Sequence, residues 1–138
     1  MEPIKVLIAD DEADYVNSLS KVLSRRGFQV TRAENGQAAL DRLAADRFDV
    51  IVLDLRMPVM DGLTALQEIR KTDTLTPIIL LSGHADVAYV HQALKGGAAD
   101  YLLKPCPVET LVSALETASE HKAISAEWKE KSDRGTRR

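Results

Sequence analysis

Short apolar segments alternate with longer amphipathic stretches along this chain, and that alternation limits the folds the chain can adopt. The apolar segments, in chain order, are Val6–Ala9, Phe28–Val30, Val50–Leu53, Pro77–Leu81 and Tyr101–Leu103. Three of them are continuously apolar and rich in β-branched residues, which is typical of strands that are buried on both faces. The stretches between them repeat apolar side chains at helical spacing, as at Leu63, Leu66 and Ile69.

Strict alternation of strands and helices predicts an α/β domain built on a parallel sheet. Right-handed crossovers then place helices on both faces of that sheet. Gly27 and the pair Gly96–Gly97 follow expected helices, and Asn35–Gly36 precedes one. We expect one domain over residues 1–120 and a helical extension over residues 121–138, with disorder after Ser132.

Charge and cysteine content exclude several classes of function. The net charge is −3, so the chain has no global basic field to hold nucleic acid or an anionic membrane. Cys106 is the only cysteine, which rules out an internal disulfide. The N-terminal segment is too short and too acidic for a signal peptide, and no apolar run approaches the ~20 residues that span a bilayer. These observations predict a cytoplasmic protein that neither enters a membrane nor binds nucleic acid directly.

A few polar residues fall where the predicted strands end. In order along the chain they are Asp10, Asp11, Glu12, Asp54, Ser82 and Lys104. In an open parallel sheet the carboxyl ends of the strands share one edge, and ligands bind there. We therefore expect these carboxylates, the hydroxyl and the ammonium group to converge on one crevice.

The chemistry of that crevice points to a cation and to phosphate. Clustered carboxylates repel one another, so the crevice must hold a cation or shift their pKa values. A hard divalent ion with oxygen ligands fits such a site, and Mg²⁺ also binds phosphate oxygens. Asp54 is the candidate nucleophile, because a carboxylate can form an acyl phosphate. Lys104 and the ion would neutralise the phosphoryl oxygens, and Ser82 would donate a hydrogen bond to one of them.

Four motifs carry a family resemblance that covers the chain to about residue 118. They are Asp10–Glu12, Asp54–Gly62, Leu81–His84 and Asp100–Pro105. In this order and spacing they closely resemble the motifs of response-regulator receiver domains of bacterial two-component signalling. Arg56–Pro58 and Ser82–Val87 look most like receivers of nitrogen-regulation and nitrogen-fixation regulators. The resemblance implies a doubly wound, flavodoxin-like fold with a five-stranded parallel sheet in the order 2-1-3-4-5.

The resemblance also implies a role for the acidic residues and their neighbours. Asp54 would be the phosphoacceptor. Asp11, Asp54 and the backbone carbonyl of Arg56 would ligate Mg²⁺ directly, while Asp10 would act mainly through water. Arg56 and His84 flank the same pocket, and their positions, apart from the resemblance, make them candidates to influence how water reaches the acyl phosphate.

For the remaining site residues the resemblance implies a switch. Lys104 would pair with the phosphoryl group, and a cis Lys104–Pro105 bond would shape its loop. Ser82 and Tyr101 would move on phosphorylation and alter the face built from the fourth helix, the fifth strand and the fifth helix. Cys106 departs from the pattern, because this family often has phenylalanine there. The implied partners are a sensor histidine kinase or phosphotransfer protein and a downstream effector or output domain, and a homodimer is also compatible.

Two other functions compete with this interpretation. A haloacid-dehalogenase-type phosphatase also uses an aspartyl nucleophile at a strand end, but it needs a second acid two residues later, where this chain has Arg56. A receiver-like interaction module that acts without phosphorylation would lack an acid, the lysine or the hydroxyl, and none of these is missing. The sequence favours a phosphoacceptor switch over an enzyme that acts on outside substrates, with the phosphate-independent module as the alternative.

Overall fold

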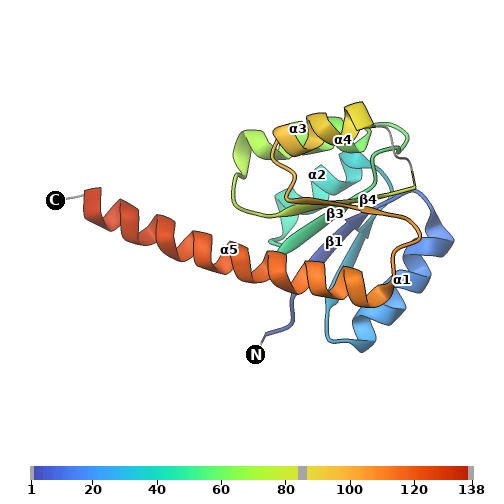
Figure 1. The fold of residues 1–138 in the computed structure, drawn as a ribbon, viewed down its shortest axis with the longest axis horizontal. Coiled ribbons are helices and arrows are strands. Elements are labelled where there is room, and N and C mark those ends of the chain that lie inside the picture. Colours follow the sequence, from blue (N-terminus) through green and yellow to red (C-terminus); the bar gives the residue numbers. More distant parts are fainter. Residues whose placement is uncertain (1, 84–86, 137–138) are drawn as a thin grey trace.

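A five-stranded parallel sheet forms the centre of the computed structural model, which describes residues 2–83 and 87–136 (Figure 1). The strands are β1 (Lys5–Ala9), β2 (Gln29–Ala33), β3 (Val50–Leu53), β4 (Ile78–Ser82) and β5 (Asp100–Leu103). The helices are α1 (Ala13–Arg25), α2 (Gly36–Ala45), α3 (Gly62–Thr72), α4 (Val87–Lys95) and α5 (Val108–Thr136). The strand order β2-β1-β3-β4-β5, with every neighbouring pair parallel, confirms the predicted fold and topology.

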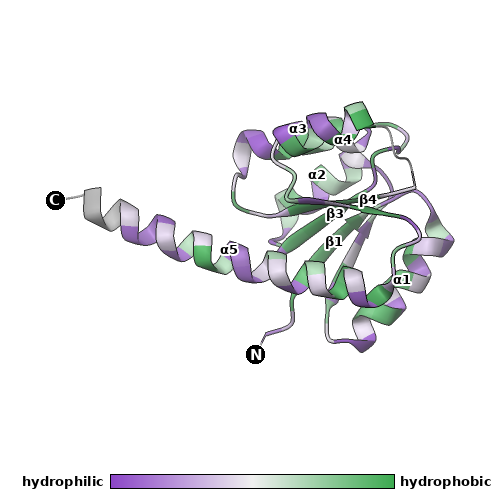
Figure 2. Cartoon of the chain, viewed as in Figure 1, coloured by the Kyte–Doolittle hydropathy of each residue, from purple (hydrophilic) through white to green (hydrophobic). Residues whose placement is uncertain are grey.

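Helices cover both faces of the sheet, α1 and α5 on one side and α2, α3 and α4 on the other (Figure 1). Successive strand residues point to opposite faces. Val6 and Ile8 of β1 therefore belong to the core under α1 and α5, while Leu7 and Ala9 belong to the core under α2 and α3. Figure 2 shows the apolar residues concentrated on the central strands between these layers. This double burial is the reason that β1, β3 and β4 are continuously apolar in sequence.

The edge strand β2 extends further than its apolar run predicts. The run ends at Val30, but the strand continues through Thr31 and Arg32 to Ala33. β2 has a strand neighbour on one side only, so Arg32 is exposed to solvent. Polar residues are tolerated at such an edge. Because they interrupt the apolar pattern, continuous apolar segments predict only part of this strand.

Helix α5 is longer than the sequence indicates. It runs unbroken from Val108 to Thr136, past Ser132, after which disorder was the expectation. Its projecting half is rich in alanine, glutamate and lysine, which form helix readily even without tertiary contacts. Figure 1 shows this half extending away from the domain. Within the described residues every helix, α5 included, is too short or too polar to span a membrane.

Lys122 attaches α5 to the domain at the point where the helix begins to project from it. Leu111, Leu115 and Ala118 bury the first part of the helix against the sheet. One turn later the ammonium group of half-buried Lys122 donates a 2.6 Å hydrogen bond to the backbone carbonyl of Phe48. Residues 123–132 are exposed. The domain therefore holds α5 as far as Lys122, and the helix continues in solvent over residues 123–132.

Candidate functional site

The carboxyl ends of four strands meet at one edge of the sheet, and main-chain hydrogen bonds continue the sheet past the strand ends. The N–H of Asp54 donates to the carbonyl of Ala9 (3.0 Å), and the N–H of Lys104 donates to the carbonyl of Ser82 (2.9 Å). The N–H of Asp10 is bonded in the same way to β2 (3.0 Å). The rigid sheet therefore positions the backbones of Asp10, Asp54, Ser82 and Lys104 next to one another.

The ammonium group of Lys104 lies among three carboxylates. It is 2.6 Å from Asp10 Oδ2, 3.6 Å from Asp54 Oδ2 and 3.6 Å from Glu12 Oε1. The side chains of Lys104, Asp10 and Asp54 are only 10%, 3% and 4% exposed. A cation this close to buried carboxylates interacts strongly with them, because water screens the charges poorly there. One ammonium group nevertheless leaves three carboxylates only partly neutralised.

Burial and neighbouring charges shift the pKa values of Asp10 and Lys104. Burial raises the pKa of Asp10 above its usual value, and the hydrogen bond from Lys104 only partly offsets this effect. The negative charge of Asp54 raises the pKa of Asp10 further. Burial alone would lower the pKa of Lys104, but its hydrogen bond to Asp10 and the charges of the three acids raise it overall. Lys104 is therefore firmly protonated, and its closest contact is with Asp10.

Asp10, Glu12 and Asp54 form a group that can hold a metal ion. One carboxylate oxygen from each lies within 4.8 Å of the others. Glu12 was not among the predicted ligands. Its backbone N–H donates to Asp10 Oδ1 (2.9 Å), and this tight turn before α1 brings the Glu12 carboxylate toward Lys104. The acidic run of three residues was the available signal, but the shape of the turn decides which of its side chains face Asp54.

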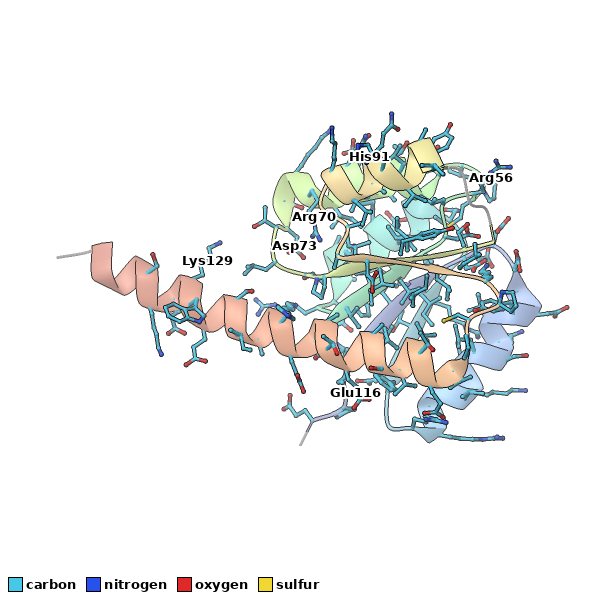
Figure 3. The ribbon with its side chains drawn as sticks, in the orientation of Figure 1. Arg56, Arg70, Asp73, His91, Glu116 and Lys129 are labelled. Atoms are coloured by element: carbon cyan, nitrogen blue, oxygen red, sulfur yellow. The ribbon has the colours of Figure 1, made fainter. Side chains whose placement is uncertain are left out.

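Asp11 and Arg56, two predicted metal-site residues, line a neighbouring cavity of about 490 Å³. Tyr89 of α4 and Asp61 line it as well. Both Asp11 and Arg56 are exposed, and the backbone N–H of Arg56 points to Asp54 Oδ1 at 3.4 Å. Figure 3 shows Arg56 at the end of the molecule remote from Asp73 and from the projecting half of α5. The cavity therefore lies next to Asp11 of the acidic run and to the residues that follow Asp54.

The backbone at Gly62, where α3 begins, lies very close to the backbone of Asp54 at the end of β3. A Cβ atom at Gly62 would lie 2.1 Å from the carbonyl oxygen of Asp54 and 2.9 Å from Leu55 Cα. Only glycine lets the start of α3 approach the end of β3 this closely. Asp61 accepts a 2.8 Å hydrogen bond from the N–H of Thr64 and caps α3. Asp61 thus begins the helix, as the sequence indicates, while Gly62 sets the position of Asp54.

The predicted switch residues lie on neighbouring strands. Ser82 is fully buried at the end of β4, and Tyr101 is half-buried on β5, where it pairs with Leu80. Tyr101 packs against the core under α3 and α4. The Lys104–Pro105 peptide bond is cis, as the family resemblance implies. His84 lies outside the described residues.

Tyr15 of α1 is a site residue that the sequence analysis did not identify. The Lys104 ammonium lies 4.5 Å from the centroid of the Tyr15 ring. Burial raises the pKa of the Tyr15 phenol above its usual value, so the ring stays uncharged beside the lysine. The contact is therefore between a cation and a neutral ring. Its position three residues after Glu12, on one helix face, was the signal available in the sequence.

Comparisons with known proteins agree with this geometry. The family model of the response regulator receiver domain matches residues 6–116. The regulatory protein AtoC of Escherichia coli (strain K12) is 36% identical over 90% of this chain and 29% of its own length. The response regulator MprA of Mycolicibacterium vanbaalenii is 38% identical over 82% of this chain and 49% of its own length. The chain thus spans less than a third of AtoC and about half of MprA.

Solved structures show the same fold. The receiver domain of the Francisella response regulator 1452 is 32% identical, with a TM-score of 0.79 over 85% of this chain and 97% of that domain. A CheY-like receiver domain protein from Methanospirillum hungatei JF-1 is 22% identical, with a TM-score of 0.86 over 89% of this chain and 98% of its own, and shows the fold alone. With residues 6–116 matched to the family model and the expected topology in place, this chain belongs to the response regulator receiver domains of two-component signalling.

Proposed function

We propose that this chain is a switch in which Asp54 accepts a phosphoryl group from a phosphohistidine of a sensor histidine kinase or phosphotransfer protein. The observation that carries the proposal is the buried ammonium of Lys104, held between Asp10 and Asp54 at the carboxyl edge of the sheet. A protonated amine beside a nucleophilic carboxylate is the arrangement that neutralises a transferred phosphoryl group.

The transfer itself needs little covalent chemistry from the protein. A carboxylate oxygen of Asp54 attacks the phosphorus atom, and the P–N bond to the donor histidine breaks as the new O–P bond forms. The departing imidazole takes up a proton. Lys104 exchanges its contact with Asp10 for a phosphoryl oxygen, and the Ser82 hydroxyl donates a hydrogen bond to another. Hydrolysis of the acyl phosphate later returns Asp54 to its starting state, so the chain acts on itself and not on outside substrates.

The acidic cluster fits Mg²⁺. Carboxylate oxygens are the ligands that this ion prefers, and three of them share a single ammonium group here. We assign Asp10, Glu12 and Asp54 as the carboxylates around the ion, and we retain Asp11 and the backbone carbonyl of Arg56 as further ligands that the family resemblance implies. Bound there, Mg²⁺ would supply positive charge to the phosphoryl oxygens. Arg56 and His84 are proposed to tune how water reaches the acyl phosphate.

The output is proposed to be a change in the face formed by α4, β5 and α5. Ser82 and Tyr101 would couple the phosphoryl group to this face, as a population shift with a coupling free energy of about 1–3 kcal/mol. The elements of this face offer apolar side chains for protein contacts, because Val87 of α4 and Leu103 of β5 are 80% and 50% exposed. A downstream effector or output domain would recognise the shifted state.

The lengths of the relatives support a proposal for how the switch is connected to its output. AtoC and MprA are longer regulators, so we infer that residues 1–120 are a receiver that controls an output domain or a separate effector, with residues 121–138 as a helical extension. The receiver would act in the cytoplasm without contacting nucleic acid or membrane itself. A homodimer is a further proposed assembly, and light scattering on the phosphorylated and unphosphorylated chain tests it.

Intact mass after incubation with acetyl phosphate tests the phosphoacceptor role. We expect an addition of ~80 Da that requires Mg²⁺ and that is absent in Asp54→Asn. The exposed Asp41→Asn variant is the matched control and should be labelled like the parent chain. No addition to the parent under any condition would favour the alternative, an interaction module that acts without phosphorylation.

A further inference from the structure

We propose that Tyr15 is a positioning residue for the phosphoryl-transfer site, whose ring face holds the Lys104 ammonium where it can exchange Asp10 for a phosphoryl oxygen. The proposal deepens the proposed function and rests on it. The observation behind it is the 4.5 Å separation between Lys104 Nζ and the centroid of the Tyr15 ring. A separation below about 6 Å over a ring face is attractive for a cation.

Tyr15 limits the positions open to Lys104. A lysine side chain has four flexible carbons, and holding its ammonium in one place costs conformational entropy. The acids contact the Lys104 ammonium directly, at 2.6 Å for Asp10 and 3.6 Å for Asp54. The ring contacts the same group and carries no negative charge for a phosphoryl group to repel. Lys104 can therefore leave Asp10 and keep the ring contact. The ring contact limits the positions that the ammonium can take before it meets a phosphoryl oxygen.

Packing against the core fixes the position of the Tyr15 ring. It is half-buried on α1 and packs against the core cluster between the sheet, α1 and α5. Cys106, two residues beyond Lys104, packs against the same cluster but carries only a small side chain. The loop that bears Lys104 has no large side chain at Cys106 to cover the lysine, and the ring that does so comes from α1.

The test compares Tyr15→Leu, Tyr15→Phe and Cys106→Ala in the full chain. The first readout is the NMR signal of the Lys104 ε-methylene in protein labelled with ¹³C-lysine, assigned by its loss in Lys104→Arg. A ring over the ammonium shifts this signal upfield. The second readout is the rate of phosphorylation by acetyl phosphate across a series of Mg²⁺ concentrations, which separates the maximal rate from the Mg²⁺ concentration at half-maximal rate.

We expect Tyr15→Leu to lose the upfield shift and to lower the maximal rate by about threefold to tenfold. The Mg²⁺ concentration at half-maximal rate should not change, because the ring acts on Lys104 and not on the carboxylates. Tyr15→Phe keeps the ring face and should restore both readouts. Cys106→Ala should match the parent chain, because a small side chain replaces a small one.

Four results would overturn the proposal: no upfield shift in the parent chain, a parent-like rate in Tyr15→Leu, an equal loss in Tyr15→Phe, or a shifted Mg²⁺ requirement in Tyr15→Leu. The last would mean that Tyr15 only supports the packing of the acidic cluster. If the parent chain is never labelled, the proposed function fails, and the NMR signal still decides whether Tyr15 holds Lys104.

Discussion

The ammonium of Lys104 donates to the carboxylate of Asp10 at 2.6 Å across 94 positions of sequence, and both side chains are almost fully buried. The pair joins the ends of β1 and β5, and it leaves the remaining carboxylates of the cluster without a full counter-charge.

Lys104→Met should destabilise the chain in the absence of Mg²⁺. Removing one partner of a buried ion pair leaves the carboxylates uncompensated, and we expect the free energy of unfolding in urea to fall by about 3 kcal/mol. Added Mg²⁺ should recover part of this loss, because the ion replaces the missing positive charge. Lys71→Met, which breaks an exposed pair with Glu68, is the control and should cost less than about 0.5 kcal/mol. A Lys104→Met chain as stable as the parent without Mg²⁺ would contradict this account of the cluster.

Gly62→Ala should impair both stability and phosphorylation. The added Cβ would lie 2.1 Å from the carbonyl oxygen of Asp54, so the start of α3 must move away from β3. We expect a loss of about 2 kcal/mol or more in the free energy of unfolding and slower labelling of Asp54 by acetyl phosphate. Gly83→Ala is the matched control, because a Cβ there meets nothing within 4 Å. Equal stability of the two variants would show that the close approach is not needed.

Val59→Gly should stabilise the chain. Val59 has a φ of 68° and is 83% exposed, so its β-branched side chain is strained and buries little apolar surface. Relief of that strain should exceed the entropy cost of glycine and raise the free energy of unfolding by about 1 kcal/mol. Gln67→Gly, at an exposed position within α3, should have the opposite sign and lose about 1 kcal/mol. Thermal and urea unfolding of both variants measures the contrast.

Asp73 should make a pH-dependent contribution to stability. Burial raises the pKa of its carboxyl, but hydrogen bonds from Thr76 and Leu75 and the charge of Lys122 outweigh it and hold the pKa below 3.8. A carboxyl with a lowered pKa in the folded state stabilises the fold above its unfolded pKa, and the contribution is lost as pH falls through the folded pKa. We expect Asp73→Asn to cost about 1 kcal/mol above about pH 5, and this difference to shrink steadily on further acidification. A difference that grows in acid would contradict the assignment.

The apolar pattern was sufficient to predict most of the fold. β1, β3 and β4 are covered by helices on both faces, so each of them contains a continuous run of apolar residues in the sequence. The alternation of strands with amphipathic helices then leads to a parallel sheet, and its carboxyl edge gathers Asp10, Asp54, Ser82 and Lys104 whatever the details of the loops. The strand that the pattern described least well is β2, because an edge strand need not be apolar along its length.

What the sequence by itself determined is therefore the order of the elements and the set of residues that meet at one edge, because both follow from local periodicity and sheet topology. Only the tertiary structure decided that Glu12 joins Asp10 and Asp54, since a turn of a few residues sets the direction of each acid. It likewise decided that the ring of Tyr15 lies over Lys104. The contacts of Glu12 with Asp54 and of Tyr15 with Lys104 join residues far apart in the chain, and their geometry depends on how α1 packs on the sheet, which no local pattern contains.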